Sequence, residues 1–70
     1  MEREEHLAWA KARAREYLSR GDAANAIASM TSDLQKHDAW RGNSIIAPLM
    51  LMATMDGTLG AARRFVEGFN

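Results

Sequence analysis

The chain has 70 residues, and its nine Lys and Arg balance its nine Asp and Glu. This length suffices for one domain and not for two, and the neutral charge excludes a strongly basic nucleic-acid-binding protein. Cysteine is absent, which excludes disulfides, thiolate metal sites and cysteine nucleophiles. The acidic start predicts no secretory signal, and the longest apolar run, Ile45–Ala53, is too short to span a membrane. We therefore expect a soluble cytoplasmic protein with a single domain over residues 1–70.

The first half of the chain predicts a helical hairpin, because helix-favouring residues are interrupted only by a Gly-Asp break. The first helix is expected from about Arg3 to Arg20, where Gly21 ends it and Asp22 caps a second helix over about residues 23–37. Apolar residues recur at helical spacing in both helices. They are Leu7, Ala10, Ala14, Tyr17 and Leu18 in the first helix, and Ala23, Ala26, Ile27, Met30 and Leu34 in the second.

The second half predicts another hairpin after a polar connection at residues 38–43. Asn43 or Ser44 is expected to cap a third helix that runs through Met55, with Pro48 in its first turn, where proline is tolerated. Residues 56–58 form a tight break, and a fourth helix is expected over about residues 59–69. The expected fold class is therefore all-α, with four short helices in two helical hairpins.

The two halves also resemble each other, because a shift of 35 residues superimposes apolar positions. It places Ala26 on Ala61, Met30 on Phe65 and Leu34 on Phe69. The segment AREYLSRGDAANAIASM resembles the core of the tetratricopeptide repeat, with Ala14 and Tyr17 in its G-x-x-Y element. Arg13 and Asp38 depart from the repeat, which prefers Leu and Pro there. The resemblance implies helical-hairpin units or a small helical bundle.

A second resemblance concerns the two ends of the chain. The strings LAWAKARAREYLSRGD and ARRFVEGFN look like those of small uncharacterised accessory proteins of tailed bacteriophages and prophages. This resemblance implies a protein made in the host cytoplasm during infection, and it transfers no catalytic or binding residue. The function we expect in this context is binding of a host or phage protein. Its most specific form is inhibition of a bacterial defence system, as by an anti-CRISPR protein.

No pattern of residues indicates an enzyme, a cofactor or a metal site. The serines are scattered without a G-x-S-x-G motif, and no glycine-rich phosphate loop occurs. His37 follows Asp33 by one helical turn, as two metal ligands would, but two ligands do not make a site. The helix dipole explains His37 near a helix C-terminus without a metal. We therefore expect a non-enzymatic protein without cofactors.

Trp9 is the strongest candidate for a partner-binding residue, together with Arg13, Glu16 and Arg20 on the same helix. At about 100° per residue, Trp9 points about 130° away from the centre of the apolar stripe. Trp and Arg dominate interface hot spots because both bury large areas and can stack on each other. The alternative is that the first helix needs a second apolar side, so that Trp9 packs on the third or fourth helix.

The third helix is expected to self-associate. Its apolar residues cover nearly every direction, which implies burial on all sides, and four short helices cannot surround one of their own. A homodimer of paired third helices buries this surplus, with Ile46, Met50 and Met52 as the predicted contact residues.

The alternative function is a small helix-turn-helix regulator that binds nucleic acid, with Arg63 and Arg64 at phosphates. DNA binding that weakens steeply with salt would distinguish this regulator from a protein-binding protein. The neutral charge balance disfavours it.

Overall fold

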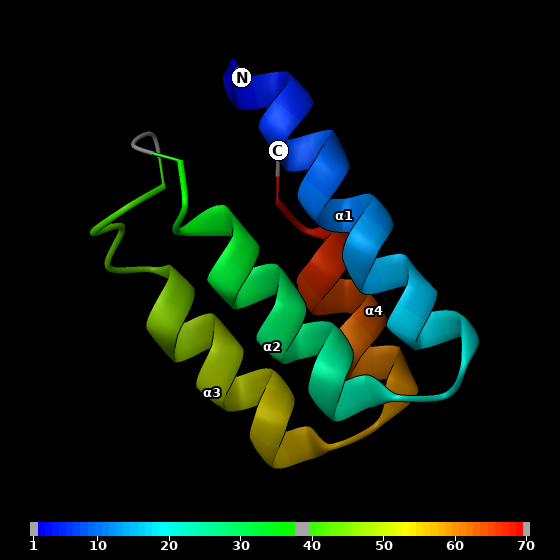
Figure 1. Cartoon of the computed structure of the whole chain (residues 1–70). Helices are drawn as coiled ribbons and strands as arrows, with labels where there is room; N and C mark the ends of the chain where they lie inside the picture. The colour runs from blue at the N-terminus through cyan, green and yellow to red at the C-terminus, as the bar shows by residue number, and fades with distance from the viewer. Residues whose placement is uncertain (1, 38–39, 70) are drawn as a thin grey trace.

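The computed structural model describes residues 2–37 and 40–69, and these residues form four α-helices without any strand (Figure 1). The helices are α1 (Arg3–Ser19), α2 (Ala23–Leu34), α3 (Ile46–Asp56) and α4 (Leu59–Glu67). This confirms the all-α fold predicted from the sequence. α2 ends before the expected His37, and α3 begins after the expected Asn43 or Ser44. Of the predicted connection at residues 38–43, residues 38 and 39 lie outside the described part of the chain.

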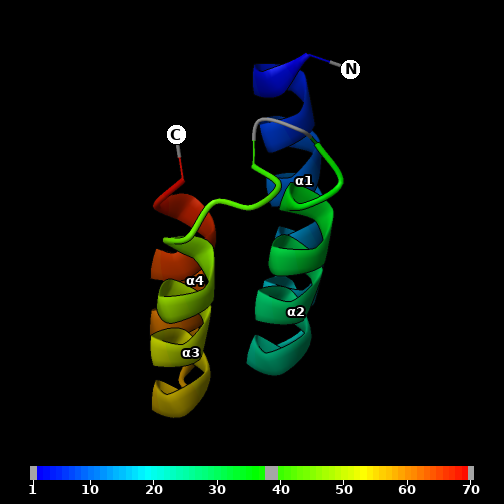
Figure 2. The same cartoon turned by 90° about the vertical axis from the view of Figure 1, so that its left-hand side faces the viewer.

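The helices pair into two hairpins, α1 with α2 and α3 with α4, which pack against each other as two layers (Figure 2). α4 lies against both helices of the first hairpin, whereas α3 contacts only α2 and α4 among the described helices. α3 therefore lies at the outside of the fold.

Polar side chains at the starts of the helices accept hydrogen bonds from backbone N–H groups that have no partner within the helix. Asp22 accepts a hydrogen bond from the Asn25 N–H at 3.1 Å, and the Thr58 hydroxyl accepts one from the Ala61 N–H at 3.1 Å. Pro48 is the third residue of α3. The predicted cap at Asp22 and the predicted place of Pro48 in the first turn are thus confirmed.

Two glycines make the tight turns within the hairpins. Gly21 follows α1 with φ of 75°, and Gly57 follows α3 with φ of 74°. This left-handed conformation is disfavoured for residues with a Cβ, so glycine lets the chain reverse within a few residues.

The core lies between the hairpins as one cluster of buried apolar side chains. Alanines allow α1, α2 and α4 to approach closely, and larger side chains fill the remaining space. The fully buried residues are Ala10, Ala14, Ala26 and Ala62 among the alanines, and Met30, Leu34, Ile46 and Val66 among the larger ones. The pairs related by the 35-residue shift are buried in both halves. Trp40, in the connection, packs edge-on against Phe69 with ring centroids 5.6 Å apart.

Candidate functional site

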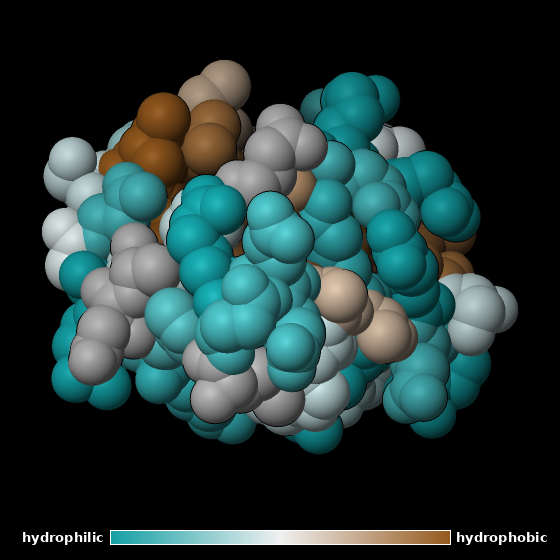
Figure 3. Space-filling view, turned by 90° about the horizontal axis from the view of Figure 1, so that it is seen from above, coloured by the Kyte–Doolittle hydropathy of each residue, from teal (hydrophilic) through white to brown (hydrophobic). Residues whose placement is uncertain are grey.

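Large apolar side chains are exposed along α3 and at the start of α4. We call these six residues the α3 apolar face: Ile45, Leu49, Leu51, Met52, Met55 and Leu59. Their exposed fractions range from 39% for Leu49 to 79% for Met55. No charged residue occurs between Ile45 and Met55. The largest apolar area in Figure 3 lies on the side where Figure 1 places α3 and the connection before it.

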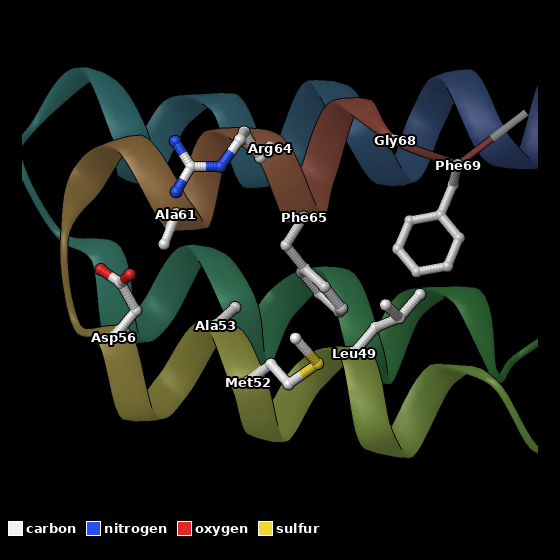
Figure 4. Close-up of a pocket in the computed structure, with 9 residues that line it drawn as sticks. All are labelled: Leu49, Met52, Ala53, Asp56, Ala61, Arg64, Phe65, Gly68 and Phe69. Atoms are coloured by element: carbon white, nitrogen blue, oxygen red, sulfur yellow. The ribbon is translucent and has the colours of Figure 1, made fainter.

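A groove of about 420 Å³ runs beside this face, between α3 and α4. Figure 4 shows Met52 and Leu49 of α3 beside Phe65 of α4, with Asp56 and Arg64 at one end. The groove is lined by Leu49, Met52, Ala53, Asp56, Ala61, Arg64, Phe65, Gly68 and Phe69. The lining is apolar along most of its length and carries opposite charges at one end.

Asp56 is held as a carboxylate at this end of the groove. Its Oδ1 accepts hydrogen bonds from the Thr58 hydroxyl at 2.5 Å and from the Thr58 N–H at 3.3 Å. These bonds, with a smaller contribution from the charge of Arg64, lower the pKa of Asp56 below its ordinary value. This end of the groove therefore carries the Asp56 carboxylate together with the cation of Arg64.

The structure distributes the predicted self-association residues over both sides of α3. Ile46 is fully buried in the chain's own core, and Met50 is partly buried against that core. Only Met52 is exposed on the surface. Within the described residues, α2 and α4 cover only the side of α3 that carries Ile46 and Ala53, and the homodimer expected to cover the rest stays a prediction.

Met52 alone among the predicted contact residues belongs to the α3 apolar face, and the other five residues of this face were not named as contact residues. One signal could have found part of it: Ile45, Met52 and Met55 stand at i, i+7 and i+10, a spacing typical of a two-helix seam. Pro48, at i+3, completes the pattern and is exposed.

A second cluster of polar and aromatic residues ties α1 to the end of α2. The carboxylate of Asp33 is buried, and the Arg13 Nε–H donates to its Oδ2 at 2.6 Å. Lys36 donates to Oδ1 at 3.1 Å. Both cations also lie against the ring of Trp9, at 5.0 Å for Arg13 and 5.6 Å for Lys36. This arrangement joins residues that are distant in the sequence.

Two histidines extend the same cluster. Nε2 of His6 lies 2.5 Å from the backbone carbonyl oxygen of Asp33. Because a carbonyl oxygen only accepts, Nε2 carries the proton. The His6 ring lies 5.1 Å from that of His37 and 5.3 Å from that of Trp9. His37 thus packs on His6, whereas Asp33 is paired with two cations. His37 and Asp33 therefore do not face a common point as two ligands of one metal ion would.

The predicted partner-binding residues lie on α1 or, for Arg20, at its C-terminal cap, and the side chains of three of the four contact other residues of the chain. Trp9 is half-buried and packs against the core cluster, and its ring lies beside His6, Arg13 and Lys36. Arg13 is paired with Asp33, although half of its side chain is exposed. Arg20 lies over the Tyr17 ring at 4.9 Å, and Glu16 is exposed.

Two basic residues of α1 are paired with Glu67 of α4. Arg15 donates to both carboxylate oxygens of Glu67 at 2.6 and 2.7 Å, and Lys11 donates to its backbone carbonyl oxygen at 3.4 Å.

Among the described residues, no three His, Cys, Asp or Glu side chains are grouped to hold a metal ion.

No family model, curated protein or solved structure matches this chain. Within the described residues, no helix has the length and apolar character needed to cross a membrane. The resemblances to tetratricopeptide repeats and to phage accessory proteins therefore stay predictions.

Proposed function

We propose that this chain is a non-enzymatic protein that acts by binding protein, and that the α3 apolar face with the adjoining groove is its contact surface. The observation that carries the proposal is the exposure of six large apolar residues on neighbouring positions. Soluble monomers rarely expose contiguous apolar patches of more than a few hundred Å², and larger patches mark interaction sites.

The energy available from covering this face supports binding. Full burial of a Leu, Ile or Met side chain contributes about 1.5–3 kcal/mol, so covering six that are roughly half exposed contributes on the order of 5–10 kcal/mol. A partner with a similar surface contributes about as much again. Together, the contributions of the two surfaces are larger than most estimates of the free-energy cost of association, which range over about 4–15 kcal/mol.

The face on α1 is the less favoured binding surface. Trp9 and Arg13 already serve the contact between α1 and α2, so a partner would have to compete with Asp33 for Arg13. A role as a phage accessory protein, including inhibition of a bacterial defence system, is compatible with the proposed binding function.

A comparison of charge-neutral variants tests the proposal. Met52→Glu with Met55→Lys places an ion pair on the α3 apolar face, and Ala24→Glu with Ala28→Lys places the same pair on exposed positions of α2 as a matched control. Each tagged chain is incubated with a bacterial lysate and with an untagged copy of itself, and captured proteins are identified by mass.

We expect the native chain and the α2 control to capture the same protein and the α3 variant to lose it. A Trp9→Ala and Arg13→Ala variant is run beside them. Loss of capture by that variant alone, with its helical circular dichroism unchanged, would move the site to α1, and equal capture by all four chains would overturn the proposed function.

A further inference from the structure

We infer that the occupant of the α3 apolar face is a second copy of this chain, bound by antiparallel pairing of the two α3 helices. This inference rests on the proposed function, since it requires that the face bind protein. It names the partner and the geometry of the complex.

The area of the face fits a dimer of small subunits. Its six residues expose the equivalent of about three whole large residues, or on the order of 600 Å² at about 200 Å² each. A standard interface buries about 800 Å² per partner, which the rims of α3 and α4 can complete.

The absence of charged residues from Ile45 to Met55 favours a second copy as the partner. Two α3 helices can lie side by side from Ile45 to Met55 without burying any charged group. A partner with charged residues at the centre of its surface would leave those charges unpaired against this face. The seam of Ile45, Pro48, Met52 and Met55 gives the spacing at which two helices interlock.

The charges at the ends of α3 favour the antiparallel direction. Its last turn contains Asp56 and no basic residue, and its first turn has neither an acidic residue nor a side-chain cap at Ile45. An antiparallel pair places the partner's Asp56 at the positive end of the α3 dipole, in both copies at once. A parallel pair would instead bring the two Asp56 carboxylates together.

Cross-linking of single-cysteine variants tests the pairing, because the chain itself has no cysteine. Ile45→Cys and Met55→Cys place thiols near the two ends of the exposed side of α3. A tagged copy of one variant is mixed with an untagged copy of the other and treated with a short bismaleimide. Ala28→Cys mixed with Ser32→Cys, both at exposed positions on α2, serves as the matched control.

We expect Ile45→Cys to cross-link to Met55→Cys in the mixture, with little linkage of either variant to itself and none in the control. Self-linkage of each α3 variant without mixed linkage would show parallel pairing and overturn the inferred geometry. Circular dichroism of each variant verifies that it is folded.

Sedimentation equilibrium of the native chain provides the second measurement. We expect a dimer of twice the 7.8 kDa of one chain, and we expect Met52→Glu with Met55→Lys to lower the association constant at least about tenfold. A native chain that stays monomeric at every concentration would overturn the inference. The proposed function would survive that result if the same variant lost a different captured protein, and would fall with it if capture were unchanged.

Discussion

Replacement of Arg13 by alanine tests whether the buried carboxylate of Asp33 depends on this guanidinium. Asp33 is 2% exposed, whereas the side chains of Arg13 and Lys36 are 50% and 57% exposed. Removal of a cation leaves a charge in the protein interior, but removal of the carboxylate leaves two cations that water can reach. The two substitutions should therefore differ in cost.

The structure gives the expected magnitudes. Arg13→Ala removes a charged hydrogen bond of 2.6 Å and a contact with Trp9, while Lys36 still holds the carboxylate. The loss is about 2–3 kcal/mol of unfolding free energy. Lys36→Ala removes a longer hydrogen bond of 3.1 Å to Asp33 and a more distant contact with the Trp9 ring at 5.6 Å, and costs about 0.5–1 kcal/mol. Asp33→Asn costs less than Arg13→Ala, about 1–2 kcal/mol of unfolding free energy, because it removes the buried charge together with its ion pairs.

Urea unfolding followed by circular dichroism, at one fixed protein concentration, measures these values. Arg13→Ala should also lower Tm by roughly 10–20 °C. The decisive chain is the double variant Arg13→Ala with Asp33→Asn, which we expect to be more stable than Arg13→Ala alone. Additive losses from the two substitutions, or a cost of Arg13→Ala below that of Lys36→Ala, would refute the reasoning.

Two further substitutions give separate predictions. Glu67→Gln should reduce the loss of stability on acidification, because hydrogen bonds from Arg15 lower the pKa of Glu67 below its ordinary value. In acid, the folded chain then binds fewer protons than the unfolded chain. The contribution of Glu67 to the unfolding free energy is therefore complete above its unfolded pKa of about 4.3, and it is lost as the pH falls through the lower pKa of the folded chain. Urea unfolding near neutral and acidic pH checks it, and an equal loss in both chains would contradict it. Gly21→Ala should cost about 1 kcal/mol, because φ is 75° while nothing lies within 4 Å of an added Cβ; Gly21→Asn, which tolerates this φ better, should cost less in the same assay.

The first hairpin could be predicted closely because its signals are local. Gly21 and Asp22 mark the turn within two adjacent residues, and the expected stripe on α1 is buried at Leu7, Ala10 and Ala14. In a helix with charged residues on one side, the period of the apolar residues also shows which side faces the core.

The orientation of α3 could not be predicted in this way. Ile45 and Ile46 are adjacent and chemically identical, yet one is 55% exposed and the other is fully buried. From Ile45 to Met55 no charged residue marks a polar side that could set the rotation of the helix, so contacts with α2 and α4 decide it. The pairing of Arg13 with Asp33 was missed for a related reason: it depends on how α1 and α2 align once the hairpin closes.

The position of Phe69 has a practical consequence for work on this protein. Phe69 lines the α3–α4 groove and is the last residue that the structure describes, whereas α1 does not line the groove. A segment joined by a short flexible linker shortly after Phe69 is held near the groove at an effective concentration of the order of millimolar. An apolar tag at that end would cover the groove within its own chain and compete with a second copy. The same tag placed before α1 starts from a helix that does not line the groove.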